Sequence, residues 1–171
     1  MTDNYVGLTI RREVLNKDGV TVDIEALKKI AVETMKYYYK YTKKSCPEIN
    51  IQRLLPDNLC IEEYNVEPEG DLRIKLSLES ENYAPFNCWM EADHPNSKEW
   101  VLFIDLARYL SSKFPEFTFN VSSSFFRSSD CAEEEKYTNL FKDGVLVERL
   151  TRQEWVERYL GVKYLRERLD K

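Results

Sequence analysis

The clearest strand signal in the chain is a strict alternation of apolar and polar residues over residues 71–80. This pattern predicts a strand with one buried face and one solvent-exposed face. The alternating apolar residues are Leu72, Ile74, Leu76 and Leu78. Residues 59–66 supply a predicted antiparallel neighbour, joined to that strand through the Pro- and Gly-containing turn at 67–71.

Further strands are predicted where β-branched and aromatic residues gather, at 5–14, 86–93 and 117–126. Two hairpins are centred on Asp-Gly pairs, one with a short return strand at 20–22 and the other spanning residues 136–149. Both carry a Lys-Asp-Gly-Val sequence. A duplicated half-domain would produce this similarity, but tight-turn chemistry explains it more simply.

Three helices are predicted from apolar spacing and from capping residues. The first begins after Asp23 and ends near Lys43 and Lys44, with a buried stripe that includes Tyr38 and Tyr41. The second has Ser97 as its N-cap and stops before Pro115. Its stripe consists of Trp100, Phe103, Ile104, Ala107, Leu110 and Phe114. The third starts with a Thr151–Glu154 capping box.

Together these elements predict a single α+β domain over residues 1–171. Its mostly antiparallel sheet carries two main helices packed on it, and a further helix lies at the C-terminus. The order of elements contains the βαββαβ order of a ferredoxin-like split sheet, with extra strands.

The composition excludes several classes of protein. The 171 residues are 43% hydrophobic and carry a formal net charge of -5, which argues against a disordered chain. No stretch approaches the roughly 20 consecutive apolar residues that a spanning helix needs, so we expect no membrane partner. The first residues lack the pattern of a secretory signal, and we expect a cytoplasmic protein.

The cysteines and glycines argue against metal and cofactor sites. Cys46, Cys60, Cys88 and Cys131 form no Cys-x-x-Cys pair, and the chain has one histidine, so we expect four free thiols and no zinc. Only five glycines are present, and no Walker or dinucleotide-binding motif occurs. We therefore predict no cofactor.

Two stretches suggest chemistry of other kinds. Glu91 and Asp93, with His94 beside them, are candidates for the oxygen ligands of a divalent cation in a metal-dependent hydrolase. In the Lys/Tyr-rich first helix, Lys36, Tyr37 and Lys40 are candidates for a nucleic-acid surface together with the basic C-terminal helix. The overall acidity of the chain disfavours nucleic acid.

Acidic residues cluster at several places upstream of that basic C-terminal segment. A charge-biased surface that contains aromatic residues suits a basic protein partner, because opposite charge accelerates encounter and aromatic side chains anchor an interface. We expect the acidic loop to be exposed. The candidate partner-binding residues are Asp130, Glu133, Glu134, Glu135, Glu62 and Glu63.

The leading hypothesis is a non-enzymatic protein-binding module. In size, acidity, aromatic content and lack of catalytic motifs, the chain resembles the small α+β immunity proteins that neutralise bacterial toxins. This resemblance is one of general type, rests on no shared motif and assigns no site residue. It implies an inhibitor or immunity protein for a basic, nuclease-like toxin. The hydrolase and the nucleic-acid binder are the alternatives.

Overall fold

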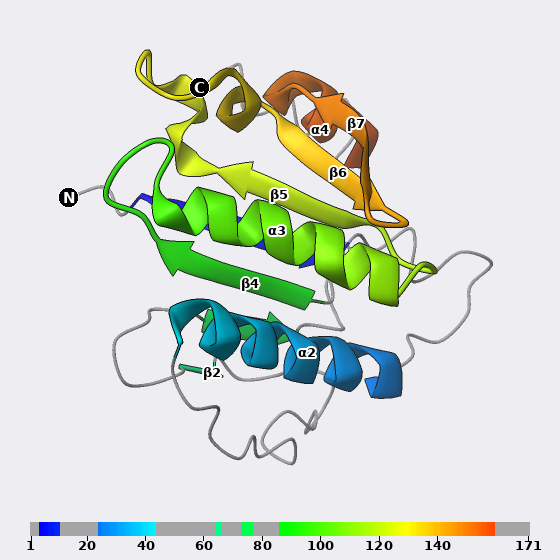
Figure 1. Ribbon diagram of the computed structural model, residues 1–171. Helices are drawn as coiled ribbons and strands as arrows, with labels where there is room; N and C mark the ends of the chain where they lie inside the picture. The colour runs from blue at the N-terminus through cyan, green and yellow to red at the C-terminus, as the bar shows by residue number, and fades with distance from the viewer. Residues whose placement is uncertain (1–3, 11–23, 44–63, 66–72, 77–85, 160–171) are drawn as a thin grey trace.

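The structure is a computed structural model, and it describes residues 4–10, 24–43, 64–65, 73–76 and 86–159. Strands and helices are interspersed along the described chain (Figure 1). The elements are β1 (Tyr5–Ile10), α2 (Ile24–Thr42), β2 (Tyr64–Asn65), β3 (Arg73–Leu76), β4 (Phe86–Glu91), α3 (Lys98–Lys113), β5 (Phe119–Ser123), the 3-10 turns η3 (Ser124–Arg127) and η4 (Glu133–Lys136), β6 (Thr138–Lys142), β7 (Val145–Leu150) and α4 (Arg152–Tyr159).

The strands form one antiparallel sheet in the order β2-β3-β4-β1-β5-β6-β7. Two βαβ units interleave in its centre. The unit β1-α2-β3 is split by β4, and the unit β4-α3-β5 is split by β1. This is the split βαβ arrangement of a ferredoxin-like sheet. The predicted α+β class with a βαββαβ core and extra strands is therefore confirmed, with β2 added at one edge and β6 and β7 at the other.

The core lies between the sheet and the two long helices, which Figure 1 shows side by side in front of the strands. Residues paired across strands share one face of a sheet, so buried side chains form rows across it. One such row of fully buried residues is Phe86, Ile10, Phe119 and Phe141. Leu8 continues the next row between Cys88 and Val121.

Helix α3 begins and ends where its sequence predicts. The Ser97 hydroxyl accepts a hydrogen bond from the backbone N–H of Trp100, and Phe114 closes the helix immediately before Pro115. The predicted apolar stripe is buried at Trp100 and Phe103, whereas Ile104 is only partly buried. The side chain of Ile74, its predicted partner from the alternating strand, lies outside the part of the chain whose side chains are described.

Helix α2 has a different buried face from the one predicted at its C-terminal end. Tyr38 is buried as expected, but Tyr41 is exposed, because it lies in the last turn of the helix. Tyr39 is buried instead, with its ring edge-on to Tyr38 at 5.5 Å between centroids. The helix ends at Thr42, and Lys43 takes a left-handed backbone conformation with φ of 58°. The predicted helix end is confirmed.

The predicted hairpin around Asp143-Gly144 is formed by β6 and β7. Both turn residues have positive φ, at 52° and 78°, as a two-residue type I′ turn requires. The backbone N–H of Gly144 donates a hydrogen bond to the Ser111 hydroxyl in α3 at 3.0 Å. The turn is therefore tied to the helix layer. The other predicted hairpin, at residues 16–22, lies outside the described residues.

We expect Gly144→Ala to lower the free energy of unfolding by about 1–2 kcal/mol. A Cβ atom would be strained at φ of 78° and would lie 3.2 Å from the Cβ of Ser112. Urea denaturation measures the change. The control is Asp143→Asn, because Asn tolerates the left-handed region and should leave stability nearly unaltered. Equal stability of the Gly144→Ala variant and wild type would contradict the turn assignment.

The last described helix starts with the capping box expected from the sequence. The backbone N–H of Thr151 donates to the Glu154 carboxylate at 2.8 Å, and the N–H of Glu154 donates to the Thr151 hydroxyl at 3.1 Å. Val156 is buried, and Arg158 holds Glu148 of β7 through two hydrogen bonds of 2.7 and 2.8 Å. These contacts anchor α4 to the edge strand of the sheet.

Candidate functional site

Glu135 in η4 is fully buried, which the sequence did not lead us to expect. Its carboxylate accepts hydrogen bonds from the backbone N–H groups of Asn96 at 2.8 Å and Ala132 at 3.3 Å. The expectation that Glu135 stands exposed in a loop is therefore wrong. A buried carboxylate needs donors to replace water, and these two backbone groups supply them.

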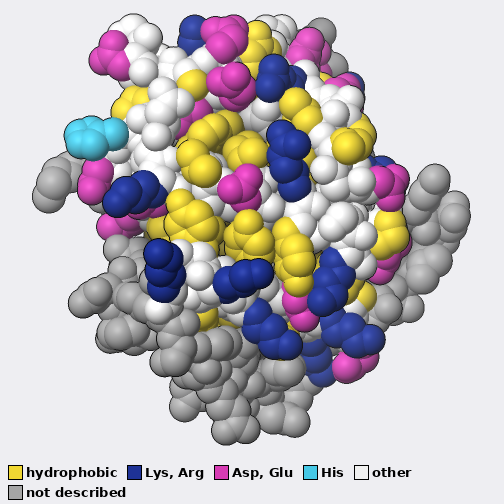
Figure 2. All heavy atoms as spheres, in the orientation of Figure 1, with side chains coloured by type: hydrophobic (Ala, Val, Ile, Leu, Met, Phe, Trp, Pro, Cys, Tyr) yellow, Lys and Arg dark blue, Asp and Glu magenta, His cyan; other side chains and the backbone are white. Residues whose placement is uncertain are grey.

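The contact between Glu135 and Asn96 joins two acidic segments that are distant in sequence. One is the loop between β4 and α3, which carries Asp93, and the other surrounds η4. We call their exposed carboxylates the acidic edge. It consists of Asp93, Asp130, Glu133 and Glu134. Figure 2 shows acidic side chains along the upper and left margins of the molecule, interspersed with Lys and Arg, and the single histidine projects at the left.

Glu133 has local partners within the acidic edge. Lys136 Nζ lies 3.1 Å from its carboxylate, and the Tyr137 hydroxyl donates to it at 3.2 Å. The hydrogen bond from Lys136 is the largest cause that lowers the pKa of Glu133, followed by the charge of Lys136 and the hydrogen bond from Tyr137. Glu133 therefore stays ionised at neutral pH. Asp93, Asp130 and Glu134 complete the negative charge of this edge.

The candidate metal ligands do not form the predicted arrangement. Strand β4 ends at Glu91, so the alternation expected to place Glu91 and Asp93 on one face stops before Asp93. Both residues and His94 are exposed. Within the described ranges, no group of three or more His, Cys, Asp or Glu side chains could hold a metal ion. Glu62 and Glu63, the other candidate partner-binding residues, lie outside those ranges.

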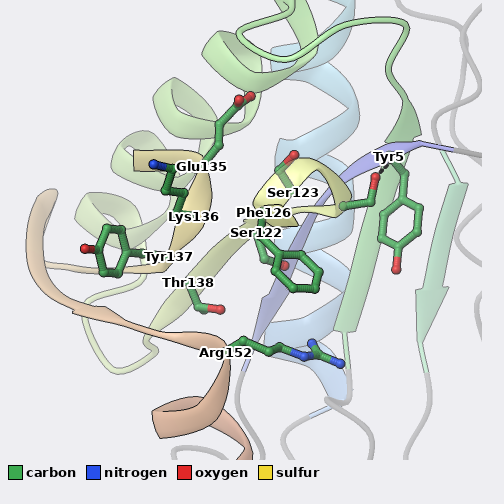
Figure 3. A pocket seen from close by; sticks show the side chains of 10 residues that line it. Tyr5, Ser122, Ser123, Phe126, Glu135, Lys136, Tyr137, Thr138 and Arg152 are labelled. Atoms are coloured by element: carbon green, nitrogen blue, oxygen red, sulfur yellow. Dashed lines mark hydrogen bonds between the residues drawn. The ribbon is translucent and has the colours of Figure 1, made fainter. Parts of the chain in front are cut away.

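A pocket of about 110 Å³ lies next to η4, on the side opposite the buried Glu135 carboxylate (Figure 3). Residues from both ends of the described chain line this pocket, including Tyr5 from β1 and Arg152 from α4. Its full lining is Tyr5, Ser122, Ser123, Ser124, Phe126, Glu135, Lys136, Tyr137, Thr138 and Arg152. The acidic edge and the pocket therefore share η4 as a common wall.

Arginines stack on the aromatic rings at this pocket. The guanidinium of Arg152 lies 5.7 Å from the ring centre of Phe126 and 5.5 Å from that of Trp155. Arg127 lies over Phe126 at 5.2 Å. Such stacking holds an arginine in place through attraction between its cation and the ring face. The sequence did not predict Phe126 or the pocket, because no local sequence pattern connects lining residues as distant in the chain as Tyr5 and Arg152.

Of the three candidate nucleic-acid residues on α2, Lys36 and Lys40 are exposed, and only Tyr37 takes part in helix packing. Tyr37 was expected on the solvent side, but it is half-buried and its ring lies 5.2 Å from that of Tyr109 in α3. The Tyr109 hydroxyl donates to Glu33 at 2.7 Å, and Lys113 Nζ lies 3.0 Å from the same carboxylate. Burial opposes ionisation of Glu33, but these hydrogen bonds outweigh it and lower its pKa.

Two of the four cysteines are described, and both are free and buried. Burial raises the pKa of the Cys88 thiol in β4, which makes it a poor nucleophile. Cys46 and Cys60 lie outside the described residues. The expectation of free thiols is thus confirmed for Cys88 and Cys131.

No described helix has the length and apolar character needed to cross a bilayer. Comparison of the chain with models of known protein families, with curated proteins and with solved structures finds no match.

Proposed function

We propose that this chain is a non-enzymatic protein-binding module that holds a basic protein partner on the acidic edge. The observation that carries the proposal is the Glu135 carboxylate, which ties η4 to the loop before α3 and so sets two acidic segments side by side. An edge with a fixed shape costs less conformational entropy on binding than two separate mobile loops.

The charge and the neighbourhood of the acidic edge support this proposal. Its exposed carboxylates belong to a chain with a formal net charge of -5, so a basic partner is attracted at long range as well as at contact. Aromatic residues stand next to it, with Tyr137 bonded to Glu133 and Phe126 lining the adjacent pocket. Aromatic side chains beside charged groups commonly anchor protein interfaces.

The most concrete form of the proposal is an inhibitor or immunity protein that neutralises a basic, nuclease-like toxin in the cytoplasm. Such a toxin binds nucleic acid through a positive surface, to which a negative edge is complementary. The identity of the neighbouring gene tests this form. A basic toxin domain encoded next to this chain supports it, and a neighbourhood without one argues for a different basic partner.

Affinity capture from the native cells tests the general proposal. We expect wild-type protein to retain a basic protein that the Asp93→Lys, Glu134→Lys double variant does not retain, because that variant reverses one charge on each acidic segment. The matched control is Glu116→Lys, Glu157→Lys, which makes the same change of net charge at exposed positions outside the acidic edge. Equal retention by both variants would contradict the proposal. So would recovery of RNA instead of protein, with binding weakened by Lys40→Glu.

A further inference from the structure

We propose that the pocket between η3, η4 and the start of α4 binds a phosphate group. Arg152 is the charged ligand in this proposal, and the hydroxyl-bearing side chains of Ser122 and Thr138 are the neutral donors that line the pocket. This site is separate from the acidic edge. It binds an anion, whereas the acidic edge is proposed to bind a basic protein. The proposal does not depend on the proposed function.

Among the described residues, no hydrogen bond or ion pair uses the guanidinium N–H groups of Arg152. Its guanidinium lies over the rings of Phe126 and Trp155, at 5.7 and 5.5 Å from their centres. Stacking occupies the flat faces of a guanidinium, whereas its N–H donors point outward in the plane. Those donors match two oxygens of a phosphate group, and such paired bonds to an anion are strong.

The other charges at the pocket leave it favourable to an anion. Glu135 contributes to the lining, but its carboxylate bonds to backbone N–H groups and points away from the cavity toward α3 (Figure 3). Lys136 is balanced by Glu133 at 3.1 Å. Arg127 adds a second cation on the Phe126 ring, with no carboxylate bound to it among the described residues. The net local charge from these groups is positive.

The size of the pocket limits what enters it. A volume of about 110 Å³ exceeds the roughly 10–15 Å³ that a cavity needs to hold one water molecule, and it is smaller than the roughly 300 Å³ or more of pockets that enclose whole ligands. A phosphate group fits inside while the rest of its ligand lies outside. The half-exposed ring of Tyr5 stands at the same pocket and offers a surface for a nucleotide base.

Titration of isotope-labelled protein with inorganic phosphate, followed by NMR at constant ionic strength, tests the site. We expect saturable shifts of the backbone amides of Ser122, Phe126 and Thr138. Arg152→Gln should weaken binding by about 10- to 100-fold, because it removes charge-assisted hydrogen bonds. The control is Arg108→Gln, since Arg108 also stacks on a ring, that of Phe141, but does not line the pocket.

A second variant separates loss of the ligand contact from loss of the helix. Ser122→Ala removes one hydroxyl from a strand and should weaken phosphate binding by about 2- to 12-fold without unfolding α4. Shifts that do not saturate, or equal affinity in the Arg152→Gln and Arg108→Gln variants, would overturn the proposal. Tighter binding of a nucleoside monophosphate than of phosphate, abolished by Tyr5→Ala, supports a nucleotide as the source of the group. Equal affinities support a phosphate group without a base.

Discussion

Replacing Phe103 with alanine is expected to lower the free energy of unfolding by about 3–5 kcal/mol. Phe103 is fully buried in the middle of α3, the helix that contacts β1, β5 and β6 at the centre of the fold. Removing the ring takes apolar surface out of the core and leaves a cavity that a rigid sheet cannot close. Because small domains have total free energies of unfolding of about 5–15 kcal/mol, this one substitution should remove a large part of the stability of the protein.

Val101→Ala is the matched control for this prediction. Val101 lies two residues earlier on the same helix, but its side chain is 49% exposed. Its truncation should change stability by less than about 1 kcal/mol. Urea denaturation of both variants, monitored by tryptophan fluorescence, gives the comparison. Similar losses in the two variants would mean that α3 does not pack on the sheet through the face assigned to it.

The second large effect is expected from Glu135→Ala, at about 1–3 kcal/mol of lost stability. The substitution removes the acceptor of two backbone N–H groups, those of Asn96 and Ala132, in part-buried hydrogen bonds, and a donor that loses its partner there carries a desolvation penalty. Besides this loss of global stability, the substitution should change the structure locally. Without this carboxylate, η4 is no longer tied to the loop before α3.

Hydrogen exchange distinguishes the local effect from a general loss of stability. In the Glu135→Ala variant, the amide of Asn96 should exchange faster relative to the amides in the centre of the sheet. Glu134→Ala is the control, because that neighbouring side chain is exposed and its removal should leave both stability and the exchange of Asn96 nearly unchanged. Unchanged exchange of Asn96 in the Glu135→Ala variant would remove Glu135 from its anchoring role.

The parts of the fold predicted from sequence are those that local chemistry determines. Ser97 caps α3, Thr151 and Glu154 cap α4, and Asp143-Gly144 turns the last hairpin, each through contacts within a few residues. The order of strands and helices then leaves few topologies. The burial of Tyr39 in place of Tyr41 could not be predicted in this way, because it depends on how far the helix packing extends.

The candidate site depends on contacts between distant residues, and its prediction was correspondingly incomplete. Glu133, Glu134 and Glu135 are chemically equivalent in the sequence, yet one is fully buried and the other two are exposed. The distinction arises from Asn96, whose N–H meets the carboxylate of Glu135 only in the folded chain. The pocket likewise joins Tyr5 to Arg152, and no local pattern links them.

Association rate as a function of ionic strength, measured with the captured partner, tests the acidic edge most directly. For wild type, we expect fast association at low salt that slows steeply as salt is added. The Asp93→Lys, Glu134→Lys variant should associate about tenfold or more slowly at low salt, with a flatter salt dependence, while Glu116→Lys, Glu157→Lys should remain closer to wild type. Equal rates for the two variants across the salt range would contradict the assignment of the partner to the acidic edge.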